Sequence, residues 1–441
     1  MELILASVYG HEGCTLKDVA GGFGTVFEVG RSWQARLLEH AKSHLAELPP
    51  VVLGHLAASL RGLGHRVQIC EVRGRVDEAS LFRADAVLVH TSLVDAHAER
   101  DLMRRLRSVG VRVVAFGAAA TALPTTFAED ADVVLVGEPE GLPAARWASV
   151  LAGAERGVLD AGQVADLDAL PLPDWRGFPI ERYRYALLTR RGPTLPIQSA
   201  RGCPYGCGYC PWRVTAAFRE RDPDAVVREA RHDRDVFGAR ALSFRDPLFN
   251  LDRDRVLALA RGLAPLGLRW SAEMRADRID RELLEVMRRA GLRSLELGVE
   301  SVNRTLLARQ RRKPPTLAQI ETVVRDATAL GIRVICNYVL GLPGDSEESM
   351  RDTIAWAKQL NSFAVQFTVA TPYPGTSLAR NRGLPVLDAP SPMTGFRPSA
   401  LEGSIRPERL AELREWAYVS YHFRPRYVAR FLRQAARSLF D

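Results

Sequence analysis

The segment from residue 199 to residue 212 reads Ser199-Ala-Arg-Gly-Cys203-Pro-Tyr-Gly-Cys207-Gly-Tyr-Cys210-Pro-Trp212. Its three cysteines are half of the six cysteines in this 441-residue chain. A structural zinc site usually takes four protein ligands, whereas three thiolates on one short loop leave a coordination position open. The segment therefore predicts an iron–sulfur cluster with one iron that can exchange its ligand.

The other cysteines and the apolar pattern indicate a reduced, cytoplasmic setting. Cys14, Cys70 and Cys336 stand singly, which does not suffice for a disulfide framework or a second cluster. The N-terminus has no basic lead and no cleavage site, and no run approaches the ~18 apolar residues of a membrane span. We expect neither export nor membrane insertion.

The net charge of +8 comes mainly from arginines, which are scattered along the chain. A nucleic-acid-binding protein would gather them into a stripe with aromatic residues. We interpret the basic run Arg309 to Lys313 as a solvated loop and expect no nucleic acid as a partner.

Residues 1–151 alternate short apolar runs with amphipathic stretches, which predicts a doubly wound α/β domain with a parallel sheet. Helices are expected at 50–64 and 96–109. Residues 152–190 are rich in Pro and aromatic residues without a sustained period and predict a linker. Strands of the first domain are expected at 3–8, 67–70, 86–90, 112–116 and 133–136.

The first strand and the helix at residue 50 are separated by a glycine-rich insertion, Ala20-Gly-Gly-Phe-Gly-Thr-Val-Phe27. A glycine pattern that does not open directly from a strand is a weak signal for phosphate binding. We interpret it as a turn that allows close backbone approach.

Residues 191–384 repeat the strand–helix pattern and predict a partial (β/α)6 barrel, in which function lies at the C-terminal ends of the strands. The cysteine segment follows the first of these strands. Residues 385–441 predict a turn-rich stretch and a helical tail, whose Trp416, Tyr418, Tyr421 and Phe423 close the open side of the barrel or pack on the linker. Barrel strands are expected at 195–198, 241–244, 268–271, 294–298, 333–340 and 364–371.

The spacing Cys203-x-x-x-Cys207-x-x-Cys210 after a strand resembles the radical S-adenosylmethionine (SAM) superfamily, and the likeness extends through the second half of the chain. The resemblance implies that the cysteines hold a 4Fe–4S cluster whose fourth iron binds SAM. It implies reductive cleavage of SAM to methionine and a 5′-deoxyadenosyl radical, which takes hydrogen from a small-molecule substrate. It also implies an electron donor such as flavodoxin or ferredoxin.

Other landmarks of this superfamily recur at the predicted strand ends. Asp246 remains from a paired acidic motif in which Pro247 replaces the second acid here. Glu273 lies at the end of the next strand, and Glu296 lies within the strand after it, on the same side as Glu300. These three carboxylates are the candidate catalytic or substrate-binding groups, and a surface ion pair is the alternative for Glu273 and for Arg275. The residues that the resemblance assigns to SAM are Tyr209, Arg275, Glu300, Ser301, Gly341 and Tyr373.

The first domain resembles the cobalamin-binding domains that are fused to radical SAM enzymes. The landmarks are the Pro-Pro and Leu-Gly-x-Leu-Ala-Ala pattern of 48–60, Gly-His-x-Val at 64–67 and Gly-Glu-x-Glu at 137–140. The family's Asp-x-His-x-x-Gly segment, which supplies a histidine as axial ligand to the cobalt, is absent. The family's Gly-Gly pair, which lets the backbone approach the corrinoid, is replaced by Gly117-Ala118. The Ala118 methyl narrows the approach to a corrinoid, so we expect a scaffold domain without cobalamin.

The compact size and altered first domain resemble the diol dehydratases of aminoglycoside pathways. This resemblance implies radical dehydration of a 1,2-diol in a polar aminosugar of antibiotic biosynthesis, with a downstream reductase as a further partner. The alternative is a cobalamin-dependent radical SAM C-methyltransferase. An RNA methylthiolase is disfavoured because no second cysteine trio precedes the barrel.

Overall fold

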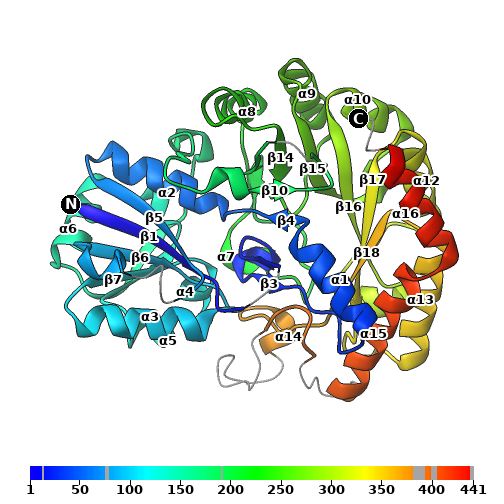
Figure 1. Ribbon diagram of the computed structural model, residues 1–441, viewed down its shortest axis with the longest axis horizontal. Coiled ribbons are helices and arrows are strands. Elements are labelled where there is room, and N and C mark those ends of the chain that lie inside the picture. The colour runs from blue at the N-terminus through cyan, green and yellow to red at the C-terminus, as the bar shows by residue number, and fades with distance from the viewer. Residues whose placement is uncertain (12–13, 75–78, 190–191, 381–392, 399–404, 438–441) are drawn as a thin grey trace.

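The computed structural model describes residues 1–11, 14–74, 79–189, 192–380, 393–398 and 405–437. Figure 1 shows two parallel sheets side by side, one in the blue-to-cyan lobe and one in the green-to-yellow lobe. The glycine-rich insertion and the first helix lie between the lobes. No helix in the described part of the chain is long and apolar enough to span a bilayer.

The first sheet is parallel and has the order β5-β1-β6-β7-β8-β9. All five predicted strands are present, and the sixth, β9, lies in the segment that we predicted to be a linker. Side chains of β9 alternate between partly buried and exposed, so this edge strand has no apolar run to reveal it. The strands are β1 (Glu2–Val8), β5 (Arg66–Val72), β6 (Ala86–His90), β7 (Arg112–Phe116), β8 (Val133–Gly137) and β9 (Gly157–Gly162).

Helices connect and cover these strands. The two predicted helices are present with nearly the expected bounds. The C-terminal ends of β1 and β6 form the point where the strand order reverses, which is where doubly wound sheets bind ligands. The helices are α2 (Val51–Gly62), α3 (Ala96–Ser108), α4 (Ala118–Ala122), α5 (Pro124–Ala128) and α6 (Ala144–Ala152).

An insert of residues 14–48 separates β1 from α2. Its short elements include a hairpin of β2 with β3 and a strand, β4, that pairs with β10 of the linker. We call residues 14–48 the insert below. Its elements are β2 (Thr15–Leu16), η1 (Ala20–Gly22), β3 (Thr25–Val26), α1 (Trp33–Ser43) and β4 (Ala46–Glu47), and β10 is Arg184–Tyr185.

The second sheet has six parallel strands in sequence order, β11-β14-β15-β16-β17-β18, which confirms the predicted partial barrel. Its strands are β11 (Thr194–Ile197), β14 (Ala241–Phe244), β15 (Arg269–Met274), β16 (Leu292–Glu300), β17 (Arg333–Leu340) and β18 (Ala364–Val369). Its longer helices are α8 (Pro223–Phe237), α9 (Arg253–Leu263), α10 (Arg281–Arg289), α12 (Leu317–Ala329) and α13 (Glu347–Leu360). Shorter elements are α7 (Trp212–Thr215), α11 (Arg304–Arg309), α14 (Ser377–Arg380), β12 (Ala200–Arg201) and β13 (Arg219–Glu220).

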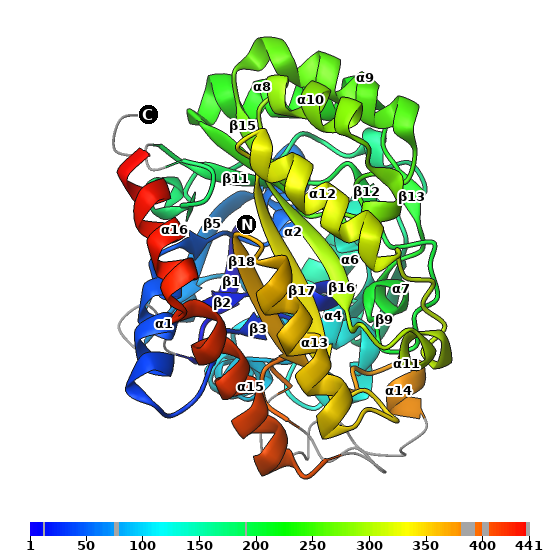
Figure 2. The same ribbon diagram turned by 90° about the vertical axis from the view of Figure 1, so that its right-hand side faces the viewer.

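Two C-terminal helices, α15 (Pro407–His422) and α16 (Pro425–Arg437), run along the edge of the barrel in Figure 2. The edge strand β18 is covered because Phe367 N donates to the Tyr418 hydroxyl at 2.9 Å. The Tyr421 hydroxyl donates to Ser362 O at 2.6 Å. Tyr418 and Tyr421 thus close the barrel as predicted, whereas Trp416 and Phe423 remain exposed. Most of the predicted turn-rich stretch lies outside the described residues.

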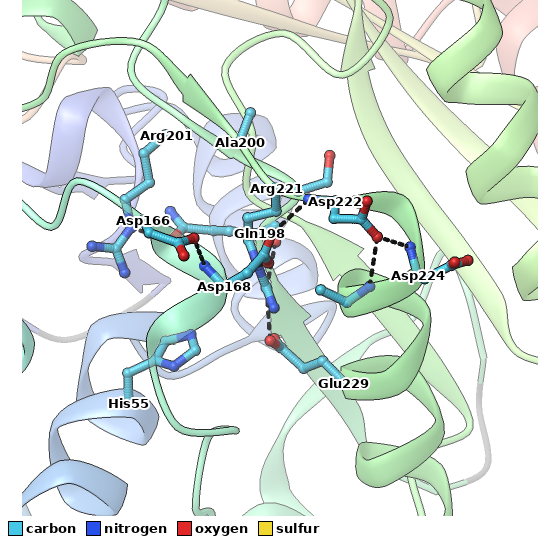
Figure 3. A network of polar contacts seen from close by, with 12 residues as sticks. His55, Asp166, Asp168, Gln198, Ala200, Arg201, Arg221, Asp222, Asp224 and Glu229 are labelled. Carbon is cyan, nitrogen blue, oxygen red and sulfur yellow. Dashed lines mark hydrogen bonds and ion pairs between the residues drawn. The ribbon is translucent and has the colours of Figure 1, made fainter.

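The linker is fixed to the barrel by a polar network, drawn in Figure 3, in which Arg221 and Glu229 are buried. Asp168 accepts from Arg221 Nε at 2.9 Å and from Asp222 N at 2.7 Å. Arg221 also donates to Glu229 at 2.7 Å, and Asp222 caps the N-terminus of α8. A charged pair of this kind is costly to break because the remaining partner stays buried and uncompensated.

A second group of ion pairs joins the first domain to the base of the cysteine loop. Arg201 lies 2.6 Å from Glu140 and 3.4 Å from Glu138, and Arg219 lies 2.5 Å from Glu138. The two arginines belong to β12 and β13, which pair with each other. The Gly-Glu-x-Glu landmark therefore anchors the loop that carries the cysteines.

Candidate active site

The three predicted cluster ligands lie on the loop between β12 and α7. Gly202, just before Cys203, has φ of +70°, and an added Cβ would meet the backbone of Ala216 and Ala217 at 2.6 Å. The loop is held at its centre because Gly208 N donates to Gln310 O at 2.8 Å. All three cysteine side chains line one cavity of about 850 Å³.

The donor set fits a cluster better than a single ion. Among the described residues, no three metal-binding side chains converge on a point where one ion would sit. A cluster with three protein-bound irons needs one thiolate for each of them, and these three thiols open onto one cavity. Burial raises the pKa of the Cys203 and Cys210 thiols, and the positive charge of bound metal would offset this effect.

The end of β16 presents a carboxylate beside the cysteine loop. Glu300 has φ of +68°, a conformation that costs of order 1–3 kcal/mol for a non-glycine residue and that marks functional sites. Its side chain lies 3.1 Å from the Arg312 guanidinium, and each is 12% exposed. Arg312 also donates to Gly298 O at 2.5 Å. Our interpretation of the Arg309 to Lys313 run as solvated is therefore wrong for Arg312.

Glu273 and Glu296 lie opposite each other on neighbouring strands and both line the cavity. The Tyr185 hydroxyl donates to Glu296 at 3.1 Å, and Asn337 Nδ2 donates to it at 3.3 Å. Burial first, and repulsion by Glu296 second, raise the pKa of Glu273 to about 8. Burial and the neighbouring carboxylate therefore both favour the protonated form of Glu273.

Asp246 is the predicted carboxylate that the structure places elsewhere. It is fully buried, does not line the cavity, and accepts from Ser199 N at 2.7 Å and from Ala200 N at 3.1 Å. Burial raises its pKa to about 6, although these hydrogen bonds oppose the rise. The carboxyl group thus fixes the turn that leads to the cysteines.

The predicted SAM contacts divide into two groups. Tyr209, Arg275, Glu300 and Tyr373 line the cavity, and the ring of Tyr373 stacks on Phe23 of the insert at 5.5 Å. Arg275 is already engaged, since it lies 2.6 Å from Asp277 and donates to Lys313 O at 2.7 Å.

Ser301 and Gly341 lie behind the cavity wall. The Ser301 hydroxyl lies 3.2 Å from that of Thr353, and Gly341 N donates to Asp345 at 3.1 Å. An added Cβ at Gly341 would meet Leu410 at 2.7 Å, so this glycine permits α15 to pack closely. Both residues support the site through packing.

The cavity also contains charged residues that the sequence did not reveal. Arg245, next to Asp246, forms a bidentate pair with Asp18 of the insert at 2.9 Å for both contacts. Lys42 of α1 donates to Gln366 at 3.0 Å and lies 4.0 Å from the ring centre of Phe27. Burial lowers the pKa of Lys42. These contacts join segments far apart in sequence, and no local pattern marks them.

The corresponding edge of the first sheet is filled by the insert. Lys17 Nζ lies 2.6 Å from Glu99 and 3.2 Å from Asp95, with all three side chains fully buried. Leu93 N donates to Phe23 O at 2.9 Å. An added Cβ at Gly22 would lie 2.9 Å from the Ala118 methyl. The described residues that line the cavity include none between Leu48 and Tyr185.

Three comparisons place this geometry among known proteins. Residues 197–357 match the sequence model of the radical SAM superfamily. An uncharacterised methyltransferase of Pyrococcus horikoshii is 26% identical over 270 residues, 60% of this chain and 58% of the relative. Bacteriochlorophyllide d C-12(1)-methyltransferase of Chlorobaculum tepidum is 25% identical over 301 residues, 66% and 64% of the two lengths. The chain thus spans less than two thirds of either relative.

One solved structure extends the likeness to both domains. The radical SAM methyltransferase TsrM from Kitasatospora setae, solved with cobalamin and a 4Fe–4S cluster, has a TM-score of 0.63 at 17% identity. The alignment covers 90% of this chain and 84% of TsrM. At this identity the likeness is one of fold.

Proposed function

Because residues 197–357 match the radical SAM superfamily, we propose that this chain methylates a small molecule bound in the cavity and uses two SAM molecules for each methylation. One electron cleaves the first SAM to methionine and a 5′-deoxyadenosyl radical, which takes a hydrogen atom from the substrate. The second SAM supplies the methyl group that replaces this hydrogen and leaves as S-adenosylhomocysteine, with a second electron from the donor. One observation carries the proposal: the three thiols open onto the same cavity as the Glu273–Glu296 pair. A substrate bound against that pair lies in the chamber where SAM is cleaved. The names of the relatives favour methylation as the outcome.

Each part of the wall has a role in this proposal. Cys203, Cys207 and Cys210 hold the 4Fe–4S cluster, which supplies the electron for SAM cleavage. Glu300 and Arg312 offer an acceptor and donors for the amino and carboxylate groups of SAM. Tyr209 and Tyr373 form the wall beside the adenosine of SAM. A flavodoxin or ferredoxin is the proposed electron donor.

Radical dehydration of a diol is the second candidate, and Glu273 favours it. An acid with a pKa of about 8 remains protonated at neutral pH and could deliver a proton to a departing hydroxyl group. The sequence alone favours dehydration. The relatives' names shift the balance to methylation, and Glu273 then serves as a hydrogen-bond donor to substrate.

Cobalamin enters the proposal through the comparison with TsrM, which counts against our expectation of a cobalamin-free scaffold. The described residues do not fit a corrinoid at the first sheet in this conformation. The insert fills the strand ends, with Lys17 between two buried acids and Gly22 against Ala118. Cobalamin binding would require the insert to leave that edge.

The deciding experiment uses SAM with a deuterated methyl group. Reduced holoenzyme, with and without added cobalamin, is incubated with labelled SAM and a metabolite extract. We expect S-adenosylhomocysteine and a product that carries the intact labelled methyl group, neither of which should form with Cys203→Ala. Formation of 5′-deoxyadenosine with no labelled product, while a substrate loses water, would instead establish dehydration. A corrinoid absorption spectrum after anaerobic reconstitution tests the second cofactor.

A further inference from the structure

The outer part of the cavity is apolar, in contrast to its inner wall. Away from the cysteines, the lining comes from α1, the linker, the start of β18 and the C-terminal helices. We call this part the outer channel and define it by Leu37, Leu38, Leu187, Val365, Val428 and Phe431. These six side chains carry no hydrogen-bonding group, although the same elements also bring Lys42, Gln366, His422 and Tyr427 to the lining. Lys42 and Gln366 are bonded to each other, so the mainly apolar outer channel favours hydrocarbon over a sugar.

The outer channel opens to solvent through exposed apolar side chains. Leu37 is 50% exposed and Phe431 is 51% exposed, and Leu45, Phe423 and Val428 are also exposed cavity-lining residues. Single exposed apolar residues are ordinary, but a contiguous group around a cavity marks a binding surface. These residues come from α1 and the segment that follows it and from the C-terminal helices, and α1 lies beside α15 (Figure 1).

Specific contacts fix the helices that surround the solvent-exposed end of the outer channel. Glu415 of α15 accepts from Arg31 N at 2.9 Å and from Ser32 N at 2.8 Å, which fixes the start of α1 against α15. The rings of Trp33 and Phe423 meet at 5.8 Å across the same junction. The apolar walls are therefore held apart at a defined separation.

The inner end offers hydrogen-bonding groups. Glu273, Glu296 and Asn337 lie there, and the Asn337 carbonyl oxygen is buried without a hydrogen-bond partner among the described residues. A buried polar atom of this kind gains most from a ligand that supplies a donor. The cavity is thus polar beside the cysteine loop and mainly apolar toward its exposed end.

We propose that the substrate is an amphiphile whose hydroxyl- or amine-bearing head meets Glu296 and Asn337 while its hydrocarbon chain lies in the outer channel. The inference rests on the proposed function only in taking this cavity as the substrate site. It replaces the polar aminosugar that we expected from the sequence. A sugar would leave Leu37, Val428 and Phe431 in contact with water and its own hydroxyl groups unpaired.

Binding of neutral fluorescent probes tests the proposal without any chemistry. Cluster-loaded, SAM-bound protein is titrated with dodecyl dansylamide and with butyl dansylamide, each kept below its aggregation limit. We expect saturable binding, with the dodecyl probe bound at least about tenfold more tightly because additional methylene groups are buried. Equal affinities for the two probes would overturn the proposal.

Variants locate the binding. Leu37→Asp should weaken dodecyl binding by roughly tenfold or more, because a carboxylate in the channel must be desolvated. Val236→Asp on α8, an exposed apolar residue that does not line the cavity, is the matched control and should bind as wild type. Ala41→Trp fills the channel from the exposed side of α1 and should reduce dodecyl but not butyl binding. It keeps the test decisive if Leu37→Asp fails to fold.

Two further readouts separate the alternatives. Cosedimentation with phosphatidylcholine–phosphatidylglycerol vesicles tests a membrane-docking surface: loss of vesicle binding in Leu37→Asp with unchanged probe binding would overturn the substrate proposal. Formation of 5′-deoxyadenosine tests the proposed function separately. Chain-length-dependent probe binding without SAM cleavage would leave the amphiphile site standing and remove the proposed reaction.

Discussion

The two parallel sheets of this protein treat their C-terminal strand ends in opposite ways. In the first sheet the ends of β1 and β6 are filled by Lys17, Phe23 and the acids around them. In the barrel the corresponding ends open into a cavity of about 850 Å³. Strand order alone predicts a binding site at both edges. The contrast shows that the insert decides which edge stays open.

Two consecutive residues of the insert face the two sheets. Lys17 pairs with Asp95 and Glu99 in the first domain, and Asp18 pairs with Arg245 at the end of β14. One dipeptide thereby fills one edge and holds Arg245, which lines the cavity, at the other. The contrast between the edges can be tested by removing groups from each.

The largest expected effect is at the open edge. Cys207→Ala should lose the cluster and reduce 5′-deoxyadenosine formation by more than about 100-fold, because one iron loses its protein ligand. Iron and sulfide analysis with chromatographic detection of 5′-deoxyadenosine measures both effects. Cys70→Ala, on β5 of the first domain, should retain cluster and activity. Full SAM cleavage by Cys207→Ala would show that the open edge is not the reaction site.

A matched pair of lysine variants compares the edges in stability. Lys17→Met should lower the free energy of unfolding by about 3–5 kcal/mol, since Asp95 and Glu99 would remain buried without a cation. Lys42→Met should be neutral or stabilising, because burial already disfavours the charge on Lys42 and its hydrogen-bond acceptor is the neutral Gln366. Urea unfolding of both variants gives the comparison. Equal losses would mean that the closed edge is not held by its ion pairs.

The pH dependence of stability should carry the signature of Glu273. Its pKa is raised from 4.5 to about 8 in the folded state, so the folded protein holds a proton that the unfolded chain has lost. The contribution of Glu273 to the free energy of unfolding is therefore greatest below pH 4.5. It falls as the pH rises to about 8, by at most about 1.4 kcal/mol per pH unit. Glu273→Gln should flatten that part of the profile, measured as urea unfolding at stepped pH. An unchanged slope would contradict a buried, protonated Glu273.

The smallest effect concerns the contact between Gly22 and Ala118. Gly22 has φ of +87°, and its added Cβ would lie 2.9 Å from the Ala118 methyl, so Gly22→Ala should cost about 1–3 kcal/mol. Adding Ala118→Gly should recover the steric part of that loss but not the strain at φ. A double-mutant cycle by urea unfolding measures the coupling. If the stability changes of the two single variants simply add in the double variant, Gly22 and Ala118 are not in contact as described.

Much of the fold followed from the sequence because apolar runs report buried strands directly. The same strand logic placed Glu296 and Glu300 on one side of β16, and both do line the cavity. β9 was not predicted, because its side chains alternate between partly buried and exposed and the strand has a glycine at each end. The period of apolar residues along a helix or strand identifies which of its side chains are buried.

The site was less predictable where the backbone leaves regular structure. After β14 the chain turns, so that Arg245 enters the cavity while Asp246, the residue in the motif, holds Ser199 and Ala200. Arg312 reached the site through a turn with a positive φ at Arg311, where charge pattern suggested solvent. Contacts such as Lys42 with Gln366 depend on the packing of distant segments, which no local pattern encodes.

The ion pairs from Glu138 and Glu140 to Arg201 and Arg219 have a consequence for the cysteine loop. The loop is braced by carboxylates that belong to the other domain. A change in the first domain can therefore shift the position of the three thiols without touching any of them.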